Sequence, residues 1–251
     1  NAGYSKYYAL SRIRFNINGG YNFFTNNIIN QETVDENLVT TTMPVNFDGG
    51  DRFNIYSGLS FPIVKNKLDA RLRLSSSYSN SFAIVNGFLN KTRSLGFNPY
   101  LRLTFTPLKQ TSLAVSGRTS IVDTKYEINT TQDQLTINTS LDVSFDTELL
   151  WKFYFNSNFN YQIYRNERFG FNETVPTLNA SLYRQFLPGN KMEARISLYN
   201  AFDINNNFNQ FASGNSVSES NTLGLGRYVM LSLTYNIKGL KSGIDKRGGW
   251  W

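Results

Sequence analysis

The chain has 251 residues, a formal net charge of +7, and neither cysteine nor histidine. These absences exclude disulfide bonds and thiolate metal sites, and they remove the side chain that most often serves as a general base or transition-metal ligand. The positive residues are scattered rather than gathered into a basic block, so nucleic acid is not an expected partner.

Apolar and polar residues alternate with a period of two along most of the chain, and this pattern predicts β-strands. The longest example is WKFYFNSNFNYQIY at 151–164, where Trp151 and the odd positions are mostly aromatic and the even positions are mostly amides. No apolar run approaches the ~18 residues of a transmembrane helix. In chain order, the pattern predicts ten strands at 12–23, 53–63, 68–75, 95–105, 112–121, 135–145, 151–164, 178–183, 192–199 and 228–237.

The connections between the predicted strands alternate in length. Short links lie at 64–68, 106–111, 146–149 and 187–191, and long polar links at 26–46, 83–92, 123–134, 164–175 and 203–223. Short turns at one end and long loops at the other are typical of an outer-membrane β-barrel. We therefore predict that residues 1–237 form transmembrane barrel strands, with short periplasmic turns and long extracellular loops. We also predict that residues 238–251 form a basic periplasmic tail.

A soluble β-sandwich or a lipocalin-like barrel also shows this alternation, but three features favour the membrane barrel. Strands of ten or more residues can cross a bilayer at a tilt, whereas soluble strands average ~5–6 residues. The polar face carries charged residues in mid-strand, as a water-filled lumen allows. Aromatic residues also gather near predicted strand ends, where interfacial girdles lie, namely Trp151, Tyr100, Phe105, Phe186, Phe202 and Tyr235.

The last quarter of the chain resembles a known family. EARISLYNAFDINNNFNQ at 193–210 and GLGRYVMLSLTYNI at 224–237 look like the last two strands of a TonB-dependent-receptor barrel, in the style of the SusC/RagA-like families. The positions that carry the likeness are Asn200, Ala201, Phe202, Arg227, Tyr228, Leu231, Leu233 and Tyr235.

The resemblance implies an antiparallel transmembrane β-barrel in the Gram-negative outer membrane, of which this chain supplies about ten strands. Such receptors have 22-stranded barrels and import nutrients. The implied partners are outer-membrane lipid, a plug domain upstream in the same polypeptide, and a lid lipoprotein or envelope-complex subunits. No catalysis and no cofactor are expected, because barrel proteases and phospholipases depend on a histidine that this chain lacks.

Two features depart from the family. The sequence shows no plug segment, and the tail KGLKSGIDKRGGWW follows the last predicted strand. The chain is therefore either the C-terminal part of a longer receptor or a complete small barrel. Two alternatives stay open: a non-transporting scaffold of a multi-protein complex, with Trp250 and Trp251 docking a partner, and a self-contained passive pore. The tail also fits a disordered basic segment.

Seven basic residues are predicted to face the lumen, namely Arg14, Arg71, Arg73, Arg102, Arg118, Lys152 and Arg195. On the lipid side near the midplane each would cost ~2–4 kcal/mol, so the alternation places them on the water side. There they could hold a plug domain, favour the passage of anions, or form a generic polar network. Asp142 and Asp146 are predicted to share this face with Lys152 and Glu193, as a solvated network rather than a catalytic site.

Overall fold

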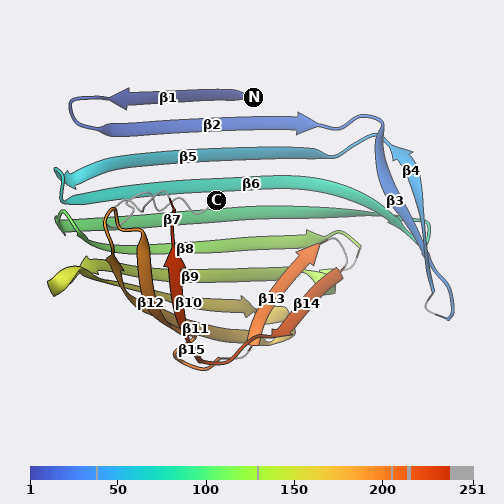
Figure 1. Ribbon diagram of the computed structural model, residues 1–251. Helices are drawn as coiled ribbons and strands as arrows, with labels where there is room; N and C mark the ends of the chain where they lie inside the picture. The colour runs from blue at the N-terminus through green and yellow to red at the C-terminus, as the bar shows by residue number, and fades with distance from the viewer. Residues whose placement is uncertain (38, 129, 205, 214–215, 238–251) are drawn as a thin grey trace.

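The computed structural model describes residues 1–237 apart from 38, 129, 205 and 214–215. The described residues form fifteen strands and three short 3-10 turns, so the prediction of an all-β fold is confirmed. Thirteen strands make one sheet and the other two make a separate hairpin (Figure 1). Within the described residues, no helix has the length and hydrophobicity needed to span a bilayer.

The strands follow one another with short connections for most of the chain. Their bounds are β1 Ala2–Tyr8, β2 Ile13–Phe23, β3 Asn27–Val34, β4 Thr40–Phe47, β5 Asp51–Val64, β6 Leu68–Val85, β7 Phe88–Leu108, β8 Thr111–Tyr126, β9 Gln134–Glu148, β10 Phe153–Asn166, β11 Phe171–Phe186, β12 Met192–Tyr199, β13 Asn206–Ser213, β14 Ser216–Leu223 and β15 Tyr228–Tyr235. The 3-10 turns are η1 Thr130–Gln132, η2 Leu150–Lys152 and η3 Glu167–Phe169.

The main sheet is antiparallel along the path β1-β2-β5-β6-β7-β8-β9-β10-β11-β12-β15. The β3–β4 hairpin is inserted between β2 and β5, and β3 adds a short parallel pairing to β6 through Gln31 and Glu32. Each end strand of the path, β1 and β15, pairs with one neighbour among the described residues. The sheet is therefore curved and open rather than a closed barrel (Figure 1).

The predicted count of ten strands is wrong, because five strands lack a clear alternation. β1 has Lys6 among its apolar positions, and the hairpins β3–β4 and β13–β14 fold within segments predicted as long loops. The loop predicted at 83–92 is also wrong, since β6 and β7 run through it. They meet at Asn86 and Gly87, whose φ angles of 50° and 81° suit a tight two-residue hairpin turn.

The central strands are much longer than those of soluble sheets. β6 has 18 residues and β7 has 21, whereas soluble strands average ~5–6 residues and a tilted membrane crossing needs ~9–11. The strands are thus long enough to cross a bilayer and continue beyond it.

Directly paired residues on neighbouring strands point to the same face of a sheet, and successive residues of a strand point to opposite faces. One row of paired residues from β2 to β10 is apolar or small: Phe15, Leu59, Leu72, Leu101, Gly117, Leu141 and Tyr161. The row beside it, on the other face, is polar: Arg14, Ser60, Arg71, Arg102, Ser116, Asp142 and Asn160. The sheet therefore has one apolar face and one polar face that persist across its strands.

Candidate functional site

The apolar face is exposed over most of its area. Leu101 is 43% exposed and Leu141 is 40% exposed, although both lie in the middle of long strands. Among the described residues, the buried hydrophobic side chains are few and mostly small or at strand ends: Ile29, Ala70, Ala114, Tyr126 and Tyr154. A soluble monomer rarely leaves so continuous an apolar surface uncovered. We therefore expect this apolar face to be covered by an apolar partner.

The apolar face has a defined width. On β7 it runs from Leu95 to Phe105, which is ~34 Å along the strand at ~3.4 Å per residue. A strand tilt of ~45° would reduce this to ~24 Å, close to the ~25 Å apolar band of outer-membrane barrels. Beyond Leu95 the same face of β7 carries Arg93, which lies opposite Lys125 of β8.

Most charges on the apolar face lie toward strand ends. Arg165 and Arg184 occupy the ends of β10 and β11, and Arg184 lies over the ring of Phe153 at 5.3 Å from its centroid. Three charges pair into apolar rows: Lys6 with Phe15 in the edge strand β1, Asp123 with Leu95, and Arg165 with Ile137. The row from Phe15 to Tyr161 carries no charge, so the middle of the band is uncharged from β2 to β10.

Four arginines of the polar face lie together on three adjacent strands, and we call them the arginine cluster: Arg71 and Arg73 of β6, Arg102 of β7 and Arg118 of β8. Arg71 lies directly opposite Arg102. Arg73 and Arg118 lie on either side of Tyr100, and the Arg73 guanidinium is 5.4 Å from the centroid of its ring. Arg102 is half-buried and the other three are exposed.

The positive charge of the arginine cluster is not neutralised by described neighbours. None of its four guanidinium groups forms an ion pair or a side-chain hydrogen bond with a described residue. On this face Asp69 lies two residues from Arg71, and Asp142 lies two strands from Arg102 and accepts a hydrogen bond from Asn160 at 2.6 Å. Like charges directly opposite on neighbouring strands repel, so Arg71 and Arg102 disfavour one another.

The remaining predicted basic residues lie elsewhere. Arg14 is in the row of Arg71 but two strands away, with its guanidinium 5.6 Å from the ring centroid of Tyr7. Arg195 of β12 forms an ion pair with Glu193 at 2.8 Å. Lys152 is not in a strand: it ends η2 with a φ of 59°, and β10 begins at Phe153. The prediction that Trp151 and Lys152 open a strand is wrong for this reason.

The polar face is acidic on the strands that follow the arginine cluster. Asp142 and Asp146 of β9 accept hydrogen bonds from Asn160 and Asn156 of β10, which confirms the predicted polar network for these two residues. Glu148 of β9, Glu173 of β11 and Glu193 of β12 share this face. The face is therefore basic over β2–β8 and acidic over β9–β12.

Three of the six aromatic residues predicted near strand ends lie there. Phe105, Phe186 and Tyr235 lie at or near the ends of β7, β11 and β15, as expected. Tyr100 is different, because it lies in the middle of β7 on the polar face, between two arginines. Its assignment to the girdle is wrong. Trp151 is 79% exposed in η2, and Phe202 lies in the turn after β12.

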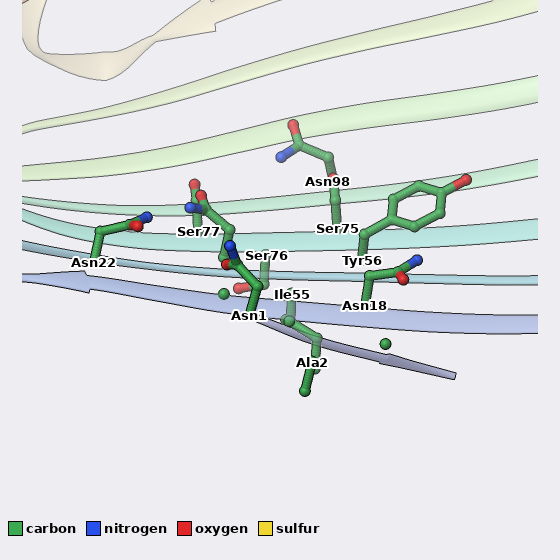
Figure 2. A pocket seen from close by; sticks show the side chains of 14 residues that line it. Asn1, Ala2, Asn18, Asn22, Ile55, Tyr56, Ser75, Ser76, Ser77 and Asn98 are labelled. Atoms are coloured by element: carbon green, nitrogen blue, oxygen red, sulfur yellow. The ribbon is translucent and has the colours of Figure 1, made fainter. Parts of the chain in front are cut away.

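Next to the arginine cluster, the polar face is lined by amides and hydroxyls. A shallow hollow of about 580 Å³ includes Asn18, Tyr56, Ser75, Ser77 and Asn98 in its lining (Figure 2). Glycines make room for this arrangement: a Cβ at Gly58 would lie 2.6 Å from Asn16 Oδ1, and a Cβ at Gly96 would lie 2.6 Å from Ser77 Oγ. The lining of the hollow contains no acidic or basic side chain.

The segment that carries the family resemblance forms a tight turn at the end of β12. The Asn200 side chain donates to the Ile204 carbonyl at 2.8 Å and accepts from the Ile204 amide at 3.2 Å. Asp203 accepts from the Arg227 amide at 2.7 Å, just before β15. Asn200 and Asp203 have φ angles of 51° and 60°, which asparagine and aspartate tolerate better than most residues. These residues thus fix the geometry between the last two strands of the sheet.

No protein-family model, curated protein or solved structure matches the chain significantly. Within the described part of the chain, no group of three or more acidic side chains lies close enough together to hold a metal ion. The tail 238–251, with Trp250 and Trp251, lies outside the described residues.

Proposed function

We propose that this chain forms part of the wall of an outer-membrane transporter that resembles the TonB-dependent receptors and imports a nutrient without bond chemistry. The proposal is carried by one observation, the coherent separation of an exposed apolar face from a charged polar face across the paired strands from β2 to β10. Lipid would cover the apolar band, and the polar face would line the water-filled interior. The Arg, Asp and Glu residues of that face would then remain solvated.

The open edges of the sheet fit this proposal. In hydrocarbon, an unpaired strand edge leaves backbone amides and carbonyls without partners, at a cost of several kcal/mol per group. β1 and β15 therefore require further strands in the membrane, and a larger barrel would supply them. A plug domain in the same polypeptide and a lid lipoprotein remain the proposed partners.

The hairpin β3–β4 is the proposed contact for a ligand or a lid. It is held against the end of β6, since the Val34 amide donates to Asn86 Oδ1 at 2.8 Å and the rings of Phe47 and Phe82 lie 4.9 Å apart. Both this hairpin and β13–β14 are inserted at the same end of the sheet, opposite the short turns at 65–67 and 109–110. A ligand arriving from outside would meet them first.

Fractionation of the cell envelope tests the proposal. The native polypeptide is expected in the outer-membrane fraction, at an intact mass well above that of 251 residues, and nutrient uptake through it should stop when a protonophore collapses the proton gradient. A polypeptide of about this length in the outer membrane, with uptake unaffected by the protonophore, would instead indicate a passive pore. Recovery in a soluble fraction would reject both.

A further inference from the structure

We propose that the arginine cluster binds a compact, water-soluble anion that carries two or more phosphate or carboxylate groups. Guanidinium groups bind these two anions through paired, charge-assisted hydrogen bonds, and this geometry is specific to arginine. The inference rests on the proposed function in two respects, that water reaches the polar face and that lipid covers the apolar face.

The cluster differs from Arg195, another arginine of this face. Arg195 is fully engaged, with Glu193 at 2.8 Å, Ser181 Oγ at 3.0 Å and the ring of Tyr183 at 4.0 Å. The guanidinium groups of Arg71 and Arg102 lack any such described partner, and their backbones hold them opposite each other. Repulsion between them is relieved when an anion binds between them.

The size of the cluster indicates a small ligand. Three adjacent strands span ~9.6 Å, and residues two apart along a strand are ~6.8 Å apart. Two anionic groups joined by a short bridge fit within these limits, whereas an extended acidic segment would reach well beyond the four side chains. Tyr100 lies at the centre, where its ring supports the Arg73 guanidinium and its hydroxyl can donate to an anion.

The face on which the arginine cluster lies indicates whether the anion is a lipid headgroup or a molecule in solution. The arginine cluster lies on the face opposite the apolar band, so a lipid headgroup in the surrounding membrane cannot reach it. The ligand therefore comes from solution. Amide and hydroxyl side chains continue from the cluster along the same strands, at Ser75 next to Arg73 and at Asn98 next to Tyr100. They offer neutral hydrogen bonds to the rest of the ligand.

Isothermal titration calorimetry tests the proposal on the native full-length polypeptide, purified in a neutral detergent at low salt. The probes are inorganic pyrophosphate and citrate, one for each anionic group. The unmodified protein is expected to bind at least one probe saturably. The double variant R71Q/R102Q is expected to bind it at least roughly tenfold more weakly, because charge-assisted hydrogen bonds are lost.

Two further variants make the result specific. R52Q removes an exposed arginine of the same face, ~20 Å along the strand from Arg73, the nearest member of the cluster, and is expected to keep the affinity within about twofold. R71K/R102K keeps both charges but not the paired hydrogen bonds, so an intermediate affinity is expected. Circular dichroism confirms that each variant is folded.

Three outcomes would overturn the inference: no binding of either probe by folded protein, equal weakening by R52Q, or tighter binding of an acidic peptide than of either probe. The last would assign the cluster to a protein partner. Because the titration needs no transport, a protein that fractionates with the outer membrane but binds no anion loses this inference and keeps the proposed function. A protein that binds the anion but does not fractionate with the outer membrane would instead keep this inference and lose the proposed function.

Discussion

The substitution Leu141→Arg is expected to lower the free energy of unfolding in a lipid bilayer by ~2–4 kcal/mol, the cost of an arginine on a lipid-facing midplane position. Leu141 lies in the middle of β9, in the apolar row between Gly117 and Tyr161. Its side chain has no described protein layer over it, so the arginine would meet hydrocarbon. Urea unfolding of protein refolded into phosphatidylcholine vesicles, followed by tryptophan fluorescence, measures the change.

The matched control is Ser140→Arg, one residue earlier on the opposite face. Ser140 lies opposite Arg118 and Gln162, so the new guanidinium would remain in water and meet one like charge. Such a cross-strand pair costs roughly 0.2–1 kcal/mol. Equal losses at 140 and 141 would contradict the assignment of the two faces.

The substitution Arg195→Met is expected to destabilise the protein by ~2–3 kcal/mol. The guanidinium donates to Glu193 Oε1 at 2.9 Å and to Ser181 Oγ at 3.0 Å. The Glu193 side chain is only 14% exposed, so the loss of Arg195 leaves a half-buried carboxylate. Among the described residues, it then keeps only the hydrogen bond from Gln185 at 3.1 Å. The same urea titration measures this loss.

Arg71→Met is the contrasting variant. Arg71 has no described ion-pair partner and lies opposite another arginine, so its removal is expected to leave stability unchanged within ~0.5 kcal/mol or to raise it. A double-mutant cycle of Arg195→Met with Glu193→Gln should show coupling. A loss at Arg71 as large as that at Arg195 would mean that the arginine cluster serves stability rather than binding.

The sequence predicts the long amphipathic strands well, because a strand with one apolar and one polar face must alternate apolar and polar residues. β9 shows this most clearly, because the neighbouring residues Leu141 and Asp142 lie on the apolar and the polar face respectively. The hairpins β3–β4 and β13–β14 escape prediction for the same reason. The two strands of each hairpin pair with one another and their sequences are mostly polar, so the alternation that predicts a long strand is weak in them.

The candidate site was predictable only in part. Alternation places Arg71, Arg73, Arg102 and Arg118 on one face, but it does not say which of them become neighbours. That depends on the register between strands, which pairs Arg71 with Arg102 and sets Tyr100 between two arginines. The position of Tyr100 on the polar face was predictable, because it occupies an even position of β7, as Arg102 does. Lys152 could not be placed, because the turn in η2 depends on backbone angles rather than on pattern.

The most direct test of the account is a nitroxide scan of β9 from Leu135 to Phe145 in lipid bilayers. The chain has no cysteine, so each introduced cysteine carries a unique label. We expect oxygen, which concentrates in lipid, to reach labels at odd positions best, and a water-soluble nickel chelate to reach labels at even positions best. Chelate access at both odd and even positions would show that neither face meets lipid and would contradict the membrane wall.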